Sequence, residues 1–318
     1  MRALRYHGNK DVRLDEIDEP KLRPGWVKIK NGWAGVCGSD LHEYLVGPKN
    51  APVKPHTITG ESIPTILGHE WGGRIVEIDN DVSEDLGLEV GRKCVVFPVL
   101  TCSDECIWCQ QGAHGCCPNW GFYGYSGYGG GFAEYVCVDA KDVLPIPDSI
   151  GLDVAALVEP LSVGWHAVKL GAPKPEDSVL VLGAGPIGIA VILCLRAHGV
   201  TNISVAEISP LRSEQAKYAG ATYVFNPKND DVVQKVREVS PDGWGPQVVI
   251  ECAGVQASMD VALPSVRGTG TIVNVGIFES DVKINLNLIN RRSLKYVGSN
   301  IYTRQEMKEV IDAIADGK

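Results

Sequence analysis

The sequence lacks an uninterrupted apolar run of the length that a membrane-spanning helix needs. Its most apolar stretch, residues 179–195, is broken by three glycines and a proline, so it would span a bilayer poorly. The N-terminus, Met-Arg-Ala-Leu-Arg-Tyr-His-Gly, lacks the apolar core of a secretory signal. We therefore expect a cytoplasmic protein.

The sequence also lacks an excess of positive charge. It carries 30 Lys and Arg against 39 Asp and Glu, a formal net charge of −9, which argues against nucleic acid or an anionic membrane as the main partner. We find no internal repeat and no low-complexity tail. With 318 residues, 44% of them hydrophobic, the chain has the composition of a soluble globular protein and room for two domains.

A glycine motif is the first feature that indicates a function. Three glycines form the pattern G-x-G-x-x-G between a strand expected at residues 179–182 and a helix expected at residues 187–195. In such a turn the glycines permit the bend, admit a pyrophosphate and let the helix pack closely, while the helix amides face the phosphates. The alternative is an ordinary turn whose glycines serve packing alone. The predicted cofactor-binding residues here are Gly183, Gly185, Pro186, Ile187 and Gly188.

An acidic residue follows at the distance that this motif requires. The strand expected at residues 202–206 ends on Glu207, 19 positions after Gly188. A carboxylate there can hold both ribose hydroxyls of NAD and repel the additional phosphate of NADP. Arg212 is an opposing signal, because an arginine near the ribose can accommodate that phosphate. We favour NAD, since the acid occupies the tip of the strand.

The order of the expected elements divides the chain into two domains. Residues 1–150 are rich in short strands and turns and show no long helical period. Residues 151–298 begin with a helical pattern over 153–170 and then alternate strands with helices, which predicts an α/β fold with a doubly wound parallel sheet. Strands are expected at residues 27–31, 73–78 and 93–98, then at 203–206, 223–225, 248–251, 271–275 and 294–297; further helices are expected at 210–219 and 230–239.

Five of the ten cysteines lie within sixteen residues. In a reducing compartment such a cluster favours metal over disulfides. Cys106 and Cys109 have the spacing of a metal knuckle, and with Cys102 and Cys117 they could close a tetrahedral Zn²⁺ site. A closed four-sulfur site is structural because it has no open position. Cys116 could replace Cys117, and a disulfide or free thiols are the alternatives.

Other residues of metal-ligand type are dispersed along the chain. Cys37 could be a core residue, His69 a turn histidine, and Glu159 a carboxylate that favours the first turn of its helix. From spacing alone, these structural roles and a catalytic metal site both stay open.

Together the motifs resemble those of the zinc-dependent medium-chain alcohol and polyol dehydrogenases, and among these the 2,3-butanediol and sorbitol dehydrogenases. They occur in the family's order: Gly35-Val-Cys37-Gly-Ser-Asp-Leu-His42-Glu-Tyr44, Leu67-Gly-His69-Glu70, the cysteine cluster, Gly130-Gly-Phe-Ala-Glu-Tyr135, Val158-Glu159-Pro-Leu-Ser-Val163 and the glycine turn. The run before Tyr44 and a long insert through residues 56–61 favour the butanediol branch. The implied fold is a GroES-like catalytic domain over residues 1–150, to which residues 299–318 return, and a Rossmann NAD-binding domain over residues 151–298.

The resemblance implies two zinc ions per chain and NAD. Cys37, His69 and Glu159 would be ligands of the catalytic zinc, and Glu70 would be a direct or exchanging ligand or support the others. Ser39 and His42 match the family's proton relay, although a single histidine at position 42 would more often lie on the surface. Cys102, Cys106, Cys109 and Cys117 would hold the structural zinc.

The implied reaction is hydride transfer between a small secondary alcohol or vicinal diol, of the 2,3-butanediol and acetoin type, and NAD. Zinc would lower the pKa of the substrate hydroxyl, and Ser39 would pass its proton towards His42. The alternatives are sorbitol, xylitol or threonine dehydrogenase activity, or an inactive NAD-binding protein. By analogy we expect a homodimer or homotetramer.

Two features depart from the family pattern. Three residues separate Cys102 from Cys106, where the family usually has two. The chain also stops at residue 318, where the family continues and completes the catalytic domain. We expect such a truncation to uncover apolar surface, with poor solubility or a partner as the consequence.

Overall fold

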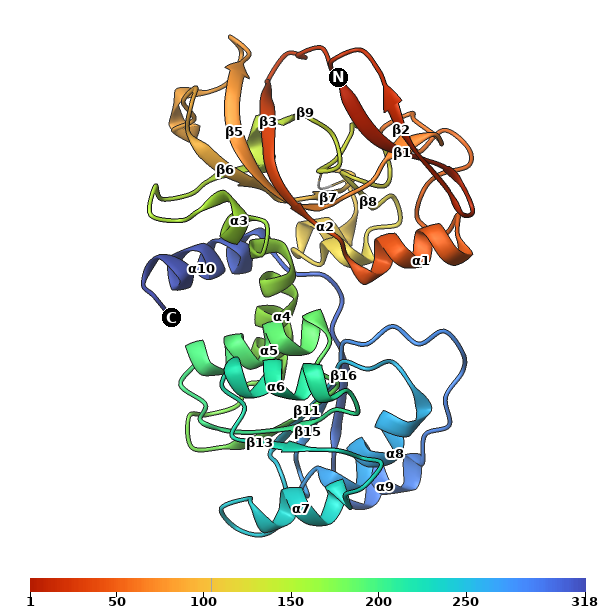
Figure 1. Cartoon of the computed structure of the whole chain (residues 1–318), viewed down its shortest axis with the longest axis vertical. Helices are drawn as coiled ribbons and strands as arrows, with labels where there is room; N and C mark the ends of the chain where they lie inside the picture. Colours follow the sequence, from red (N-terminus) through yellow and green to blue (C-terminus); the bar gives the residue numbers. More distant parts are fainter. Residues whose placement is uncertain (104) are drawn as a thin grey trace. The chain divides into compact units, whose positions relative to one another are not determined.

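The computed structural model describes residues 1–103 and 105–318, and it divides into two compact units (Figure 1). The first comprises Met1–Glu159 and Thr303–Gly317, and the second comprises Pro160–Tyr302 with Lys318. The first unit therefore extends nine residues past the boundary expected at residue 150. Helix α3 (Leu152–Ala155) accounts for this extension, because it packs against strands of the first unit.

The first unit is built mainly of antiparallel sheets. A five-stranded sheet has the order β10-β6-β5-β3-β9, and β2-β1-β4 and β7-β8 form smaller sheets. Its core includes Val27, Ile29, Ile75 and Val136. The strands are β1 (Arg2–Gly8), β2 (Asp11–Glu16), β3 (Trp26–Gly35), β4 (Thr65–Ile66), β5 (Glu70–Ile78), β6 (Lys93–Val96), β7 (Val99–Leu100), β8 (Gly121–Phe122), β9 (Tyr135–Asp139) and β10 (Val143–Pro145).

Helices connect these strands, and those within residues 1–150 were not expected. Helix α1 (Gly38–Val46) follows β3 directly, although the sequence shows no long helical period there. The pattern at residues 153–170 forms two helices, α3 and α4 (Val158–Gly171), in place of the single helix expected, because the chain turns at residues 156–157 after α3 docks on β3 and β5. The unit also contains α2 (Ile107–Gln110), α10 (Arg304–Ala315) and the 3₁₀ turns η1 (Glu84–Leu86), η2 (His114–Cys116) and η3 (Ala140–Asp142).

The second unit contains the predicted doubly wound sheet. Its six strands are all parallel and have the order β13-β12-β11-β14-β15-β16, so the strand order reverses at β11. The strands are β11 (Ser178–Leu182), β12 (Asn202–Ala206), β13 (Tyr223–Phe225), β14 (Val248–Glu251), β15 (Thr271–Asn274) and β16 (Lys295–Gly298); the helices after α4 are α5 (Pro186–Ala197), α6 (Pro210–Tyr218), α7 (Val232–Glu238), α8 (Gln256–Ser265) and α9 (Leu286–Arg291).

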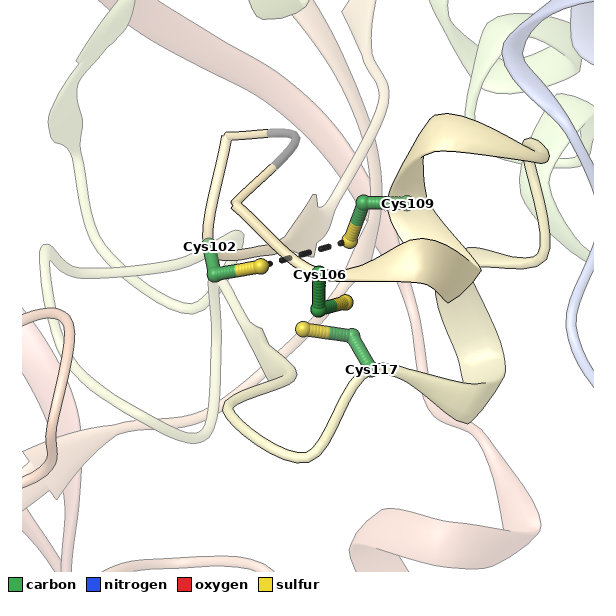
Figure 2. A group of neighbouring side chains, drawn as sticks. All are labelled: Cys102, Cys106, Cys109 and Cys117. Carbon is green, nitrogen blue, oxygen red and sulfur yellow. Dashed lines mark hydrogen bonds between the residues drawn. The ribbon is translucent and has the colours of Figure 1, made fainter.

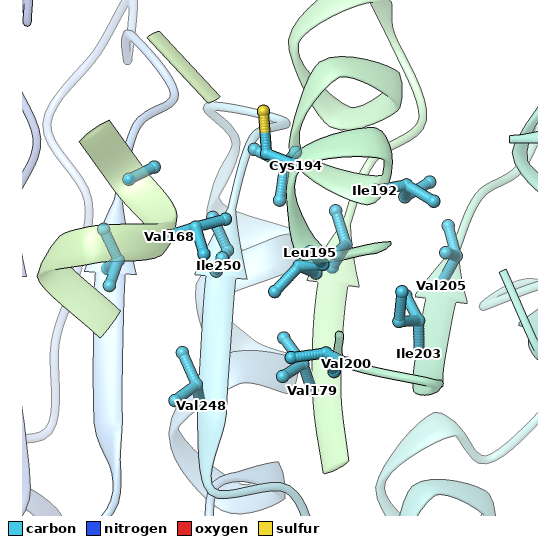
Figure 3. Close-up of a cluster of buried hydrophobic side chains, with 14 of the residues drawn as sticks. Val168, Val179, Ile192, Cys194, Leu195, Val200, Ile203, Val205, Val248 and Ile250 are labelled. Atoms are coloured by element: carbon cyan, nitrogen blue, oxygen red, sulfur yellow. The ribbon is translucent and has the colours of Figure 1, made fainter. Parts of the chain in front are cut away.

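Both faces of this sheet are covered, which explains the continuous apolar run in β11. Val179 and Val181 point into a cluster with residues of α4, α5 and α6, drawn in Figure 3. Leu180 and Leu182 point to the opposite face, against residues of α7 and α8. Among the described residues, no helix combines the length and hydropathy needed to cross a membrane.

Candidate functional site

Three of the dispersed residues converge in the first unit. One possible ligand atom from each of Cys37, His69 and Glu70 lies within 4.8 Å of the others. The pairing of β3 with β5 explains this, because it sets Gly35 opposite Glu70. Cys37 stands two residues further along, immediately before α1, and therefore faces the start of β5.

Gly35 makes room for this cluster. A Cβ atom at position 35 would lie 2.2 Å from Oε2 of Glu70, and 3.2 Å from its Cβ. Any other residue would therefore push the Glu70 side chain out of its place. Burial raises the pKa of Glu70, and the charge of His69 opposes that shift.

Asp40 supports the ring of His69 and the backbone of Cys37. Its Oδ2 accepts a hydrogen bond from the Cys37 amide at 3.0 Å, while its Oδ1 lies 3.7 Å from His69 Nδ1. Oδ1 and Nδ1 are buried, and neither has a hydrogen-bond partner among the residues that the structure describes. A carboxylate behind a histidine is the arrangement that orients metal-ligating imidazoles. Sequence analysis did not assign Asp40 a role, although an acid three residues after an N-cap is a recognisable helix-start signal.

Negative charge is concentrated around His69. Burial lowers its pKa, but the nearby Asp40 and Cys37 side chains and the charge of Glu159 together raise that pKa well above its usual value. Glu159 is buried at the start of α4, and it is not one of the three residues grouped by distance. The structure thus brings Glu159 into electrostatic range of His69.

Helix α1 carries Ser39 and His42 three residues apart, on the same side of the helix. Both are partly buried. Ser39 Oγ accepts a hydrogen bond of 2.7 Å from the hydroxyl of Tyr125, and the Tyr125 ring lies 5.0 Å from the ring of His69. Burial, with the charge of Asp40, raises the pKa of Tyr125, so its hydroxyl keeps its proton. No sequence signal had indicated Tyr125, since only the fold brings it to this place.

The cysteine cluster forms a separate group. Figure 2 shows the sulfur atoms of Cys102, Cys106, Cys109 and Cys117 directed towards one another. These four sulfur atoms all lie within 4.8 Å of one another. Cys102 reaches Cys109 at 3.6 Å despite the additional residue before Cys106. The backbone amide of Cys109 lowers the pKa of the Cys106 thiol to about 7. Cys116 is exposed and outside the group.

Both groups have the donor chemistry of zinc sites. Four thiolates complete a tetrahedron, as structural zinc requires. Cys37, His69 and Glu70 offer sulfur, nitrogen and oxygen, and a three-ligand set leaves a position for substrate. His69 Nδ1 and Asp40 Oδ1, which face each other without a hydrogen bond, also favour a zinc site. A zinc ion on His69 Nε2 would keep the proton on Nδ1, from which the ring can donate to Asp40.

The glycine turn lies between β11 and α5 in the second unit. Gly183 has a φ of +90°, which favours glycine, and a Cβ at Gly188 would lie 2.1 Å from the Gly183 carbonyl oxygen. At Gly185, the N-cap of α5, a Cβ would meet nothing within 4 Å. The space in front of the α5 N-terminus is therefore open, and a side chain at position 185 would fill it. A phosphate group fits such a space, because the amides of the helix N-terminus face it.

Glu207 lies beside this turn, because Leu182 pairs with Ala206 in adjacent parallel strands. Its Oε2 accepts a hydrogen bond from the Ala184 amide at 2.8 Å, and its Oε1 accepts from the amides of Ile208 and Ser209. The carboxylate is thereby fixed at the carboxyl edge of the sheet. Arg212 is exposed in the first turn of α6.

Comparison with known proteins covers both units. Residues 23–148 match the family of alcohol dehydrogenase GroES-like domains, and residues 186–316 match the family of zinc-binding dehydrogenases. The chain is 41% identical over 298 residues to an (R,R)-butanediol dehydrogenase of Bacillus subtilis, which covers 93% of this chain and 83% of that protein. The crystal structure of a 2R,3R-butanediol dehydrogenase from Bacillus subtilis has a TM-score of 0.92 at 38% identity, covering 99% of this chain and 88% of that chain. A sorbitol dehydrogenase of Bacillus subtilis is 31% identical, over 100% of this chain and 86% of its own length.

Proposed function

The chain belongs to the zinc-dependent medium-chain alcohol and polyol dehydrogenases, and we propose that within this family it interconverts 2,3-butanediol and acetoin with NAD. It is a zinc-dependent oxidoreductase that acts on secondary alcohols or diols and uses a nicotinamide cofactor. The choice of butanediol rests on the names of the relatives with 34–41% identity.

One observation carries the proposed chemistry: a thiol, an imidazole and a carboxylate meet at the start of α1, the helix that also presents Ser39. Cys37, His69 and Glu159 would hold the catalytic ion, with Glu70 as a fourth or exchanging ligand. Bound there, Zn²⁺ would lower the pKa of the substrate hydroxyl. The cysteine cluster would hold the structural ion.

The chain's own residues would handle the proton. Ser39 Oγ takes the proton of the substrate hydroxyl, and His42, one turn further along α1, passes it towards solvent. Asp40 keeps the His69 ring in place, while the burial of His69 and Glu70 restricts water at the ligands. The nicotinamide ring supplies the redox chemistry.

The cofactor would bind along the glycine turn. The amides at the start of α5 would face its pyrophosphate, and Glu207 would accept hydrogen bonds from the ribose hydroxyls. Three backbone amides hold the Glu207 carboxylate against the turn by hydrogen bonds. The additional ribose phosphate of NADP would therefore be repelled by a fixed negative charge. We therefore propose NAD in preference to NADP.

A substrate panel tests the proposal. NAD reduction is measured with each stereoisomer of 2,3-butanediol, and with sorbitol, xylitol and L-threonine. The highest kcat/KM should be found with a butanediol isomer. A higher value with sorbitol or threonine would move the assignment to that branch of the family, and NAD binding with no turnover on any alcohol would leave only the cofactor-binding function.

We also propose a cytoplasmic homodimer or homotetramer. None of the ten cysteines forms a disulfide, which suits a reducing compartment. Strand β16 lies at the edge of the parallel sheet beside β15, with no further strand next to it in the described part of the chain, so a second copy could extend the sheet there. The molar mass in solution tests this, and a monomer at micromolar concentration would contradict it.

A further inference from the structure

The Tyr125 hydroxyl is buried at the candidate site, and the proposed function does not yet use it. We propose that Tyr125 is a positioning residue for the proton relay, which holds the Ser39 hydroxyl in the orientation that receives the substrate proton. This role rests on the proposed function for its catalytic consequence, but its structural part can be tested separately.

The geometry gives Tyr125 contact with two parts of the site. Its hydroxyl donates to Ser39 Oγ at 2.7 Å, and its ring lies against the His69 ring with centroids 5.0 Å apart. The side chain is only 4% exposed, so water does not compete effectively for this hydrogen bond. Tyr125 thus links the first turn of α1 to a candidate zinc ligand.

A serine hydroxyl has two lone pairs and one proton, and unless a partner fixes it, its Oγ moves between side-chain rotamers and its O–H bond rotates. If one lone pair of Ser39 accepts from Tyr125, the other is left for the substrate proton, and the Ser39 proton is directed away from both. The donor therefore selects one orientation of Ser39. Without it, Ser39 would sample orientations in which no lone pair faces the substrate.

The backbone around Tyr125 is fixed by the insert at residues 56–61. The Thr59 hydroxyl donates to the Ser126 carbonyl, and the Glu61 carboxylate accepts from the Tyr128 amide at 3.2 Å. The Tyr128 hydroxyl donates to the Ile58 carbonyl at 3.1 Å. Because three hydrogen bonds from the insert anchor the residues that follow Tyr125, its hydroxyl is held at a defined position over Ser39.

The variant Tyr125→Phe keeps the ring against His69 and removes only the hydroxyl. We expect kcat to fall about tenfold, the effect of one hydrogen bond that matters in the transition state, with an unchanged KM for NAD. Tyr135→Phe is the matched control, since it removes a tyrosine hydroxyl from β9 in the same unit and should leave kcat unchanged. Equal rates for Tyr125→Phe and the wild type would overturn the proposal.

A double-mutant cycle identifies the partner. If Tyr125 acts through Ser39, the variant with both Ser39→Ala and Tyr125→Phe should be no slower than Ser39→Ala alone. If the two losses multiply, Tyr125 acts through another group, such as His69, and the proposal fails.

Crystal structures provide a readout that does not depend on turnover. Ser39 should have one rotamer in the wild type and in Tyr135→Phe, and more than one in Tyr125→Phe. A single, unchanged Ser39 rotamer in Tyr125→Phe would overturn the positioning role whatever the activity. If the wild type oxidises no alcohol while Ser39 becomes disordered in Tyr125→Phe, the positioning role stands and the proposed function fails.

Discussion

At the scale of single residues, the candidate catalytic site depends on side chains that are distant in sequence and share one small space. Cys37 and His69 are 32 positions apart, yet the pairing of β3 with β5 brings them together with Glu70. Each of the three has a different donor atom. This combination favours a zinc ion, because zinc accepts cysteine sulfur, histidine nitrogen and carboxylate oxygen as ligands.

The first prediction concerns Cys37. Replacing it with alanine removes the sulfur ligand, so Cys37→Ala should lower kcat by about 1,000-fold or more. Binding of NAD, measured by fluorescence titration, should stay near that of the wild type, because the glycine turn lies in the other unit. Cys116→Ala is the matched control, as Cys116 is exposed and outside both groups. Normal turnover of Cys37→Ala would refute the assignment.

The second prediction concerns cofactor choice. Glu207→Gln keeps a hydrogen-bond acceptor for the Ala184 amide but removes the charge, so the preference for NAD over NADP should narrow by roughly tenfold. This preference is measured as the ratio of kcat/KM with NAD to kcat/KM with NADP. Glu214→Gln removes the same charge from an exposed position on α6 and should leave the ratio unchanged. An unchanged ratio in Glu207→Gln would show that Glu207 does not distinguish the ribose of NAD from that of NADP.

The sequence predicted the ligand types at this scale but not their supporting residues. The four clustered cysteines have a spacing that can be read along the chain, whereas Cys37 and His69 became candidate ligands only through the resemblance of their motifs to those of a family. Asp40 lies within one of the family motifs but was given no role, and Tyr125 lies outside all of them. Tyr125 lies 86 positions from Ser39, so only the packing of a turn against α1 reveals their contact.

At the scale of elements, helix α1 was the main omission in the first unit. Its nine residues are too few to establish a clear 3.6-residue period, and Gly38 at its start weakens the signal. By contrast, β11 and its glycine turn were predictable, because both faces of β11 are buried and the turn demands glycine. Elements with strong local constraints were found, whereas short elements held by tertiary contacts were not.

The third prediction tests the cysteine cluster as a folding element. Cys106→Ser should lose the structural ion and lower Tm by roughly 5 °C or more, since structural zinc contributes folding free energy directly. Cys116→Ser should change neither zinc content nor Tm. Elemental analysis measures the zinc content of each variant, and a thermal scan measures its Tm. Unchanged values for Cys106→Ser would mean that the cluster holds no metal.

The fourth prediction concerns the ion pair that ties α10 to η3. Arg304 contacts the buried Asp142 at 2.8 Å, but burial outweighs Arg304 and raises the pKa of Asp142 to about 6. Because this folded-state pKa exceeds the usual value of 3.8, the native state binds more protons between the two, and its stability must fall as the pH rises from about 4 to about 6.

Asp142→Asn removes this titration. The stability of the wild type relative to Asp142→Asn should therefore fall by up to roughly 3 kcal/mol over that pH range. Thermal scans of both proteins at several pH values measure the difference. A difference that stays constant, or that grows with pH, would contradict the assigned shift.

At the scale of the whole molecule, the order of elements was predictable and the limits of the units were less so. Alternating strands and helices indicated the doubly wound sheet, and the structure contains it with six parallel strands. The segment at residues 151–159 belongs to the first unit because α3 contacts β3 and β5. Such a long-range contact leaves no local signal in the sequence.

The central claim is that one chain holds two zinc ions, one of them at Cys37, His69 and their neighbours. Zinc content per chain, measured by elemental analysis of the purified protein, tests this most directly. We expect about two zinc ions in the wild type and about one in both Cys37→Ala and Cys106→Ser, because each variant removes a ligand from a different group. If Cys37→Ala retained as much zinc as the wild type, the dispersed residues would not be a metal site and the proposed chemistry would be wrong.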